Sequence, residues 1–464
     1  MDNTEQAWLP DLIYVDDAFQ SGLALVLDSK GQILRIAPQS EVTNPTRLKN
    51  RALLPGLINT HSHAFQRVIR GRTEFRSQNT DSFWTWRELM YAAANKLEPD
   101  DVYAASRMTF LEMALTGITA VGEFHYLHHA PGGKPYDDPN LLAMEVVRAA
   151  RDVGIRIALL RVAYARTGYD LEPNPLQVRF IEKAPEVYLA NVQKLKTQLG
   201  DTEAMAWVGI APHSVRAVPL PYLKSIINYG TEQELPIHMH VAEQPAEVSA
   251  CIEEYGRSPV ALLSTEGLLS RRFCAVHAIH VTSKAIESVA EAGATVCACP
   301  TTERNLGDGV IPVDGYFKEQ VPISLGTDSQ VQIDLLEDAR ELEYHLRLQR
   351  KERNVLAPWD DLSQSALARR LFKCATINGA ESIGLAGGNL GTGLPGDFFT
   401  VDLNDPSIAG AGKEDLLSAI VFSLSRTAVR EVFVAGKQII EAGRHPLQDE
   451  IVRNFSDLQR RLWN

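Results

Sequence analysis

The stretch Leu53–His63, LLPGLINTHSH, joins an apolar, strand-like run to two histidines that lie two positions apart. Three later apolar runs also end in a potential metal ligand. Pro236–His240 and Phe273–His277 end in histidine, and Val321–Asp328 ends in aspartate. Side chains so distant in sequence can bind one ion only if the ends of these strands lie together. A parallel β/α barrel brings them together, because its active site forms at the carboxyl ends of its strands.

The composition is that of an ordinary globular protein, and 464 residues are enough for more than one domain. The formal net charge of −12 argues against nucleic acid or an anionic membrane surface as a partner, but it does not exclude a small anionic substrate. The five cysteines are odd in number, so we expect free thiols and a cytoplasmic protein. We expect no secretory signal at Met1–Gln6 and no membrane span, which would need about 20 apolar residues.

Strand-like and helix-like segments alternate through the middle of the chain, which favours a parallel sheet. After the last strand, the apolar spacing from Leu335 to Leu346 follows one face of a helix. We therefore predict an α/β fold, with a (β/α)8 barrel of the TIM type over residues 53–385. The eight strands are expected near Leu53–Asn59, Ile118–Glu123, Arg156–Ala163, Trp207–Ala211, Pro236–His240, Phe273–His277, Thr295–Cys299 and Pro322–Thr327.

Both ends of the chain contain short, strand-like segments separated by turns. Residues 1–52 carry three such segments, and residues 386–464 carry two more and a helix at the C-terminus. Neither end is long enough to make a good domain alone. We predict that the two ends together build one small β-sandwich domain.

The two histidines of the opening stretch have the spacing of a metal site. Residues i and i+2 of a strand face the same side, so His61 and His63 can point together into the barrel mouth. A lone histidine is more often a packed, hydrogen-bonded residue, but that interpretation weakens for ligands at several strand ends. With His240 and Asp328 the set suits Zn²⁺, which lowers the pKa of bound water from ~15.7 to ~7. His238 shares the phase of His240, and we place it in an inner layer of the barrel.

An acid follows the third of these histidines, because Glu243 begins the loop after His240. A carboxylate near a metal ion, but not bound to it, can move protons to and from bound water. The alternative for Glu243 is a solvated loop acid. His277 is equally well placed to bind the ion or to hydrogen-bond the water, and Asp328 can also orient that water.

Several arginines and polar side chains follow the same strand ends. An arginine holds a carboxylate through two parallel hydrogen bonds, although any single arginine is more often a surface residue. Two arginines that point into one barrel mouth would indicate a substrate with two carboxylates. The candidates are Gln66, Arg67, Arg87, Tyr126, His213, Arg216 and Arg304.

The whole ligand pattern resembles the amidohydrolase superfamily, and in particular its mononuclear zinc deaminase branch. The resemblance covers nearly the entire chain, and it implies one Zn²⁺ per chain. The binuclear branch usually carries a carboxylated lysine on the fourth strand, and Trp207–His213 contains no lysine. The roles that the resemblance implies are metal binding by His61, His63, His240 and Asp328, and catalysis by Glu243, His277 and Asp328.

Three segments narrow the resemblance: Asp81–Arg87, His238–Gln244 and Pro300–Gly309. They are similar to deiminases of bacterial histidine breakdown, which hydrolyse N-formimino-L-glutamate to N-formyl-L-glutamate and ammonia. This similarity implies the same small dicarboxylate substrate and a homodimer. The substrate contacts that it implies are Gln66, Arg87, Tyr126, His213 and Arg216.

Three alternatives stay open at this point. The nearest is another deaminase of the same branch, acting on guanine, cytosine or a nucleoside, whose pocket would need stacking and amide groups instead of convergent arginines. The second is a hydrolase of cyclic amides, which usually has two metals. The third is a barrel that only binds ligands, and the intact ligand set with Glu243 argues against it.

Overall fold

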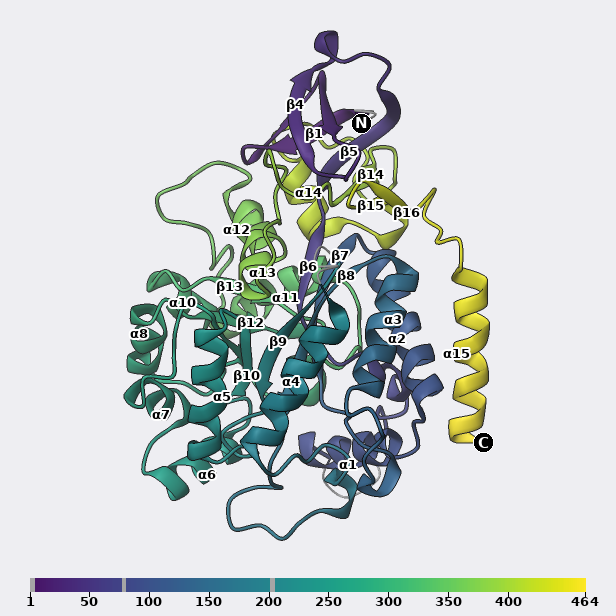
Figure 1. Cartoon of the computed structure of the whole chain (residues 1–464). Coiled ribbons are helices and arrows are strands. Elements are labelled where there is room, and N and C mark those ends of the chain that lie inside the picture. The colour runs from purple at the N-terminus through teal and green to yellow at the C-terminus, as the bar shows by residue number, and fades with distance from the viewer. Residues whose placement is uncertain (1–4, 77–80, 201–204) are drawn as a thin grey trace.

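Eight parallel strands form the centre of the computed structural model, and helices surround them (Figure 1). The structure describes residues 5–76, 81–200 and 205–464. The strands follow one another in the sheet in the same order as along the chain, which confirms the predicted barrel. They are β6 (Leu57–Ser62), β7 (Ile118–His125), β8 (Arg156–Ala163), β9 (Ala206–Pro212), β10 (Ile237–Val241), β11 (Phe273–His277), β12 (Thr295–Ala298) and β13 (Ile323–Leu325).

The barrel closes where β6 meets the segment after β13. An isolated parallel bridge joins Ser62 to Asp328, and the backbone N–H of Asp328 donates to the carbonyl oxygen of His61 at 3.0 Å. A Cβ atom at Gly326 would lie 2.7 Å from the Cβ atom of His61. The lack of a side chain at Gly326 therefore lets the first and last strands approach each other.

The first barrel strand begins later than the sequence predicts. Leu53–Pro55 instead ends β5 (Thr46–Pro55) and pairs antiparallel with β14 (Phe398–Asp402). Proline lacks the N–H that would continue a ladder, and a Cβ atom at Gly56 would lie 2.2 Å from the Thr119 side chain. The Pro-Gly pair therefore separates two strands that the apolar pattern joins. The other seven predicted strands agree with the observed bounds to within two residues.

Strands from both ends of the chain form a second sheet, which lies above the barrel in Figure 1. Its eight strands are joined by hydrogen bonds into one sheet, so the two ends do build a common unit. A small core lies against it, in which the rings of Phe398 and Phe433 stack with centroids 4.4 Å apart beside Trp8. Besides β5 and β14, the strands are β1 (Gln6–Val15), β2 (Ala18–Gln20), β3 (Leu23–Leu27), β4 (Ile33–Pro38), β15 (Val429–Val434) and β16 (Lys437–Ile440).

Helices follow most of the barrel strands. The predicted helix after the last strand is α11 (Leu335–Arg350), and its apolar face is buried as expected. Among the described residues, no helix is long and apolar enough to cross a membrane. Most of Met1–Gln6 lies outside the described residues. The other helices are α1 (Phe83–Ala94), α2 (Pro99–Ala114), α3 (Leu141–Val153), α4 (Pro185–Leu199), α5 (Leu220–Glu232), α6 (Pro245–Tyr255), α7 (Pro259–Thr265), α8 (Ser283–Glu291), α9 (Pro300–Leu306), α10 (Val313–Lys318), α12 (Ala366–Cys374), α13 (Ile377–Ser382), α14 (Leu416–Ser423) and α15 (Gln448–Trp463), with 3-10 turns that include η2 (Ala64–Ile69) and η4 (Pro175–Gln177).

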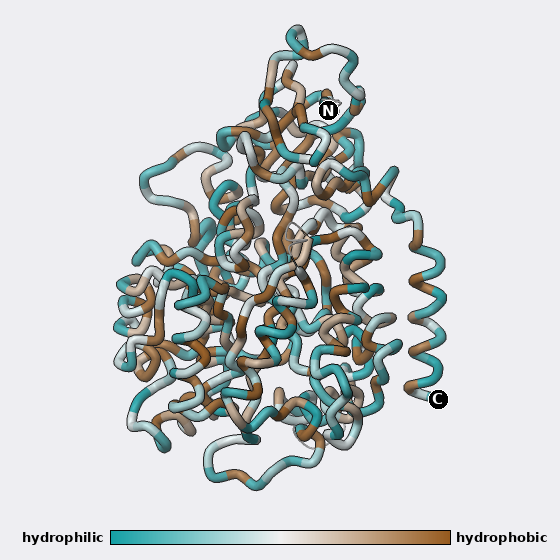
Figure 2. The backbone as a smooth tube through the Cα atoms, viewed as in Figure 1, coloured by the Kyte–Doolittle hydropathy of each residue, from teal (hydrophilic) through white to brown (hydrophobic). Residues whose placement is uncertain are grey.

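The C-terminal helix α15 runs along α2 at the side of the barrel (Figure 1). Apolar and polar residues alternate along it (Figure 2), as expected for a helix with one buried face. The side chains of Gln459 and Trp463 both donate to the carbonyl oxygen of Val68, at 3.0 and 3.3 Å. The C-terminus thereby holds η2, the turn that directly follows His63. The buried face consists of Ile451, Phe455, Leu458 and Leu462.

We propose the two domains that the sequence predicts, residues 53–385 and residues 1–52 with 386–464, with two adjustments at their bounds. The pairing of Leu53–Pro55 places the end of β5 with the terminal sheet. The contact between α15 and α2 places the C-terminal helix against the barrel.

The close approach at Gly326 leads to a stability prediction. Gly326→Ala should force the last strand away from His61, and such overpacking typically costs about 1–3 kcal/mol of unfolding free energy. Thermal unfolding should show a lower Tm. Gly412→Ala is the matched control, because the nearest atom to its new Cβ is 3.4 Å away. Equal Tm values for the two variants would contradict the role given to Gly326.

Candidate active site

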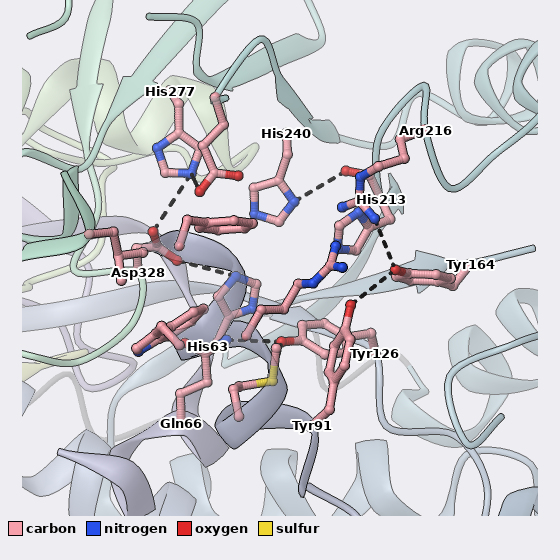
Figure 3. A pocket seen from close by; sticks show the side chains of 16 residues that line it. His63, Gln66, Tyr91, Tyr126, Tyr164, His213, Arg216, His240, His277 and Asp328 are labelled. Carbon is pink, nitrogen blue, oxygen red and sulfur yellow. Dashed lines mark hydrogen bonds and ion pairs between the residues drawn. The ribbon is translucent and has the colours of Figure 1, made fainter. Parts of the chain in front are cut away.

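A cavity opens at the carboxyl ends of the barrel strands (Figure 3). Ten of the eleven site residues that the sequence indicated line this cavity. The eleventh, His61, is fully buried beside it. The structure therefore brings the whole predicted set together. The ten lining residues are His63, Gln66, Arg87, Tyr126, His213, Arg216, His240, Glu243, His277 and Asp328.

Three histidines and one aspartate converge at one point of the cavity. The Nε2 atom of His61 lies 3.2 Å from Nε2 of His63 and 3.1 Å from Nε2 of His240. Asp328 completes the group, because its Oδ1 atom lies 3.2 Å from Nε2 of His63. The four ligand atoms lie within 4.8 Å of one another, which is compact enough for them to share one metal ion.

The hydrogen-bond partners of the histidines show which ring nitrogens lack a hydrogen. His63 donates from Nδ1 to the carbonyl oxygen of Phe124 at 2.9 Å, and His240 donates from Nδ1 to that of His213 at 3.1 Å. A neutral ring has one N–H, so both Nε2 atoms turn bare lone pairs toward the cluster. Burial lowers the pKa of His61 to about 3 and that of His240 well below its usual value, which keeps these rings neutral. Bare nitrogens and a carboxylate facing one another fit a divalent cation.

A chain of buried hydrogen bonds connects the two elements that carry these ligands. Asn59 Nδ2 donates to Thr327 Oγ1 at 2.7 Å, and Asn59 Oδ1 accepts from the Thr327 N–H at 3.1 Å. Thr327 Oγ1 donates to Gln330 Oε1 at 2.9 Å, and Gln330 Nε2 donates to Ser62 Oγ at 2.8 Å. Ser62 in turn donates to Glu123 at 2.5 Å. These side chains hold β6 and the segment after β13 in one register, so that the ligands on both meet.

His277 lies beside the cluster and is surrounded by carboxylates. Its Nε2 atom is 3.8 Å from Glu243 Oε1 and 3.6 Å from Asp328 Oδ2. Its Nδ1 atom is 3.2 Å from Glu303 Oε1, which also accepts from the Cys299 N–H at 2.9 Å. Burial alone would lower the pKa of His277, but these carboxylates together raise it well above its usual value. Glu303 therefore orients His277, a role that its place in a helical segment after β12 did not reveal.

Glu243 lines the cavity beside His277. Burial raises the pKa of Glu243 above the usual value, so this carboxyl accepts a proton more readily than an exposed one. Its neighbour Gln244 donates to Asp308, and burial followed by the charge of Glu243 raises the pKa of Asp308 to about 9. Burial therefore favours the protonated, uncharged form of Asp308 beside Glu243.

Two arginines enter the cavity without an acidic partner. Within the described part of the chain, neither Arg87 nor Arg216 forms an ion pair, and both line the cavity. Arg87 lies over the rings of Trp84 and Tyr91, at 4.4 and 5.4 Å from their centroids. Two guanidinium groups that line one cavity without a direct ion pair favour an anionic ligand. On the wall below them, Gln66 Nε2 donates to the Tyr126 hydroxyl at 2.9 Å.

Several other residues singled out in the sequence have structural partners. His238 is buried within the barrel, with Nε2 2.8 Å from the carbonyl oxygen of Ser382, as expected for an inner layer. The remaining arginine candidates are paired with acids outside the cavity. Cys299 lies close to His277 and Asp328, and these three could also approach an ion. The arginine pairs are Arg67 with Glu112 and Arg304 with Glu341, each at 2.6 Å.

Sequence reasoning missed the aromatic wall of the cavity. Tyr164 directly follows β8, so the strand-end rule that found the histidines could have found it as well. Tyr91 lies on α1, and no local pattern separates it from an ordinary core residue. The other lining residues that were not predicted are Phe83, Trp86, Met90 and Leu306.

A parallel barrel with a cation-binding group at its strand ends, an adjacent carboxylate and an arginine-lined cavity defines a metal-dependent hydrolase site. The sequence pattern of the amidohydrolase family matches residues 52–439. The chain belongs to this family.

Known relatives agree with this assignment. Formimidoylglutamate deiminase of Pseudomonas aeruginosa is 35% identical over 97% of this chain and 97% of its own length. The crystal structure of an amidohydrolase from Brucella melitensis has a TM-score of 0.91 and 33% identity, and covers 99% of this chain and 100% of that one. The structure of an adenosine deaminase from Xanthomonas campestris with bound zinc has a TM-score of 0.83 at 21% identity, over 98% of both chains, so it shows the fold alone.

The ligand geometry predicts the metal content. Purified protein should contain about one tightly bound divalent ion per chain, because among the described residues one group of four ligand atoms is compact enough to hold an ion. His61→Ala and Asp328→Ala should abolish binding in elemental analysis. His240→Gln should lose the ion, whereas His238→Gln, two residues earlier on the same strand, should retain it. Two ions per chain would contradict this assignment.

Proposed function

We propose that this protein hydrolyses N-formimino-L-glutamate to N-formyl-L-glutamate and ammonia, as a step of histidine breakdown. One observation carries the proposal: a single cavity combines a cation-binding cluster with two arginines that have no acidic partner among the described residues. A substrate with an amidine carbon and two carboxylates matches both ends of that cavity. The identity with the deiminase of Pseudomonas aeruginosa supports the same substrate.

The proposed metal is Zn²⁺, one ion per chain, held by His61, His63, His240 and Asp328. Neutral imidazole nitrogens with one carboxylate oxygen are typical zinc donors. When bound, Zn²⁺ would supply an acidified water molecule at the cluster. No lysine is present on β9, where a second ion of the binuclear type would need one.

Glu243 is the proposed proton carrier. Its carboxylate accepts a proton from the attacking water and delivers it to the imino nitrogen of the substrate. Oxygen adds to the amidine carbon, the bond from that carbon to the imino nitrogen breaks, and both hydrogens of the water leave with ammonia. His277 hydrogen-bonds the water from Nε2 while Glu303 holds its Nδ1 atom, and Asp328 orients the same water.

The substrate contacts follow from the charges of the cavity. Arg87 and Arg216 each bind one carboxylate, since each presents a guanidinium that forms no direct ion pair within the described residues. Gln66 has a buried Oε1 atom with no partner, so it can accept a hydrogen bond from the substrate amidine. Tyr126 and His213 complete the wall around the substrate stem.

The alternative is a deaminase of guanine, cytosine or a nucleoside, and one observation favours it: the aromatic rings of Phe83, Trp86 and Tyr91 could stack on a heterocycle. A neutral heterocycle would leave both arginines without an anion. An ammonia-release screen with guanine, cytosine and N-formimino-L-glutamate decides between the two functions.

Two further properties are proposed from the sequence and the family resemblance. The odd number of free cysteines and their burial favour a cytoplasmic enzyme. The family resemblance favours a homodimer. The net charge of −12 argues against nucleic acid or a membrane surface as a partner. Size-exclusion chromatography with light scattering tests the dimer.

The role of Glu243 predicts the effect of an isosteric change. Glu243→Gln keeps the shape of the side chain but cannot accept a proton, so turnover should fall by about 10²–10⁴-fold. The metal content should stay normal. Glu253→Gln, at an exposed position of the following helix, should leave kcat unchanged. Near-normal turnover of Glu243→Gln with the ion retained would show that Glu243 is only structural.

The two arginines predict substrate specificity. Arg87→Met and Arg216→Met should each lower kcat/KM for N-formimino-L-glutamate by at least ~10-fold, since a lost charged hydrogen bond costs ~1.5–3 kcal/mol and each 1.36 kcal/mol is tenfold. Arg304→Met is the control, because Arg304 pairs with Glu341 away from the cavity. A formamidine without carboxylates should be a poor substrate. Ammonia release from guanine or cytosine, and none from N-formimino-L-glutamate, would overturn the proposed function.

A further inference from the structure

A second polar cluster lies on the cavity wall away from the metal ligands (Figure 3). Gln177, at the end of η4, donates from Nε2 to the Tyr91 hydroxyl at 2.8 Å and to the Tyr164 hydroxyl at 2.9 Å. The two hydroxyl oxygens are 3.3 Å apart. Gln177 is fully buried behind the two tyrosines, and only the tyrosines reach the cavity.

The hydrogen count of this cluster leaves a donor without an acceptor. An amide nitrogen has two hydrogens and no lone pair to offer, so Gln177 Nε2 uses one hydrogen on each phenol oxygen. Each phenol keeps its own O–H hydrogen. One hydroxyl can donate to the other, but the second then has no acceptor among the described residues. Burial raises the pKa of Tyr91, so this phenol stays protonated as a donor.

The opposite orientation of the Gln177 amide is less well satisfied. It would turn Oε1 toward the hydroxyls and take their hydrogens. Both hydrogens of Nε2 would then face the buried position where Oε1 has no partner. The observed orientation leaves Oε1 and one O–H unpaired, but that O–H belongs to a tyrosine that lines the cavity, where a ligand can accept from it, whereas the opposite orientation would leave both unpaired donors buried behind the tyrosines. The observed orientation therefore makes the hydroxyl pair a donor group toward the cavity.

Charge around the hydroxyl pair identifies the acceptor. Arg216 lies 3.5 Å from the Tyr164 hydroxyl, and the guanidinium of Arg87 lies over the Tyr91 ring. Neither arginine has an ion-pair partner within the described residues. Two cations and an unused O–H converge on one end of the cavity, and a carboxylate accepts from both kinds of donor.

The ring of His213 separates this end of the cavity from the metal ligands. His213 packs against His240 at a centroid distance of 4.8 Å, and Tyr164 packs against the same His213 at 4.5 Å. A substrate whose amidine carbon lies at the ligand cluster would therefore reach the tyrosines with its far end.

We propose that Tyr91 and Tyr164 donate hydrogen bonds to the distal carboxylate of the substrate, and that Gln177 is a positioning residue that fixes both hydroxyls as donors. The proposal rests on the proposed function. It makes the loop that carries η4 a determinant of substrate length, because Gln177 comes from outside the barrel strands.

The test compares variants on two substrates that differ only in the distal carboxylate. These are N-formimino-L-glutamate and N-formimino-L-2-aminobutyrate. Tyr164→Phe, Tyr91→Phe and Gln177→Leu should each lower kcat/KM for the glutamate derivative by about 10-fold, mainly through KM, and leave kcat/KM for the truncated substrate unchanged. Inhibition constants of N-formyl-L-glutamate and N-formyl-L-2-aminobutyrate give the same comparison by binding alone.

Further variants separate specificity from structure. Gln177→Glu replaces the two N–H donors of the amide by carboxylate acceptors, which would accept the tyrosine O–H hydrogens. Its kcat/KM for the glutamate derivative should therefore fall further than that of Gln177→Leu. Tyr229→Phe, whose hydroxyl contacts the exposed Gln193 side chain, should match the intact enzyme on both substrates. If the tyrosine and Gln177 variants lost equal factors of kcat/KM on both substrates, or if Gln177→Glu were fully active on the glutamate derivative, the proposal would be overturned. The proposed function would still stand. No ammonia release from N-formimino-L-glutamate by the intact enzyme would overturn both.

Discussion

The contact between the first and last barrel strands is the constraint on which the rest of the site depends. His61 and His63 come from β6, whereas Asp328 follows β13, so the ligand group exists only if the barrel closes there. Closure needs a position without a side chain at Gly326 and a polar junction that satisfies every group it buries. Buried polar groups are costly unless they are paired, so this junction specifies one register of the two strands.

The same closure brings ring nitrogens and a carboxylate together, and a cation between them would satisfy these electron-rich atoms. The Nε2 atoms of His63 and His240 have no hydrogens to share, and burial lowers the pKa of His61 and His240. At the far end of the cavity, Arg87 and Arg216 form no direct ion pair within the described residues, so both guanidinium groups can bind an anion. A ligand with an electrophilic carbon at one end and carboxylates at the other would satisfy both ends, and Glu243 and His277 lie beside the reacting end.

Part of the backbone strain of the protein lies at the strand ends that form the site. Ala242, His277, Ala278 and Asp328 all have positive φ, between 47° and 69°, although none of them is glycine. Such conformations cost of order 1–3 kcal/mol each and persist only where the surrounding structure enforces them. Here they lie at or just after the ends of β10, β11 and β13. A sequence pattern gives no sign of this strain, because these residue types usually adopt negative φ.

Local patterns in the sequence determined the fold class, seven of the eight strand positions and the polar residues at the strand ends, because periodicity and strand-end placement depend on near neighbours. They could not separate β5 from β6, since only pairing with β14 distinguishes Leu53–Pro55 from the barrel strand. They also could not find Glu303, Tyr91 or Gln177, which reach the site from helices and a distant turn. Those positions were decided by the tertiary structure alone, because long-range packing determines which distant side chains share a cavity and which of their hydrogen bonds remain unused.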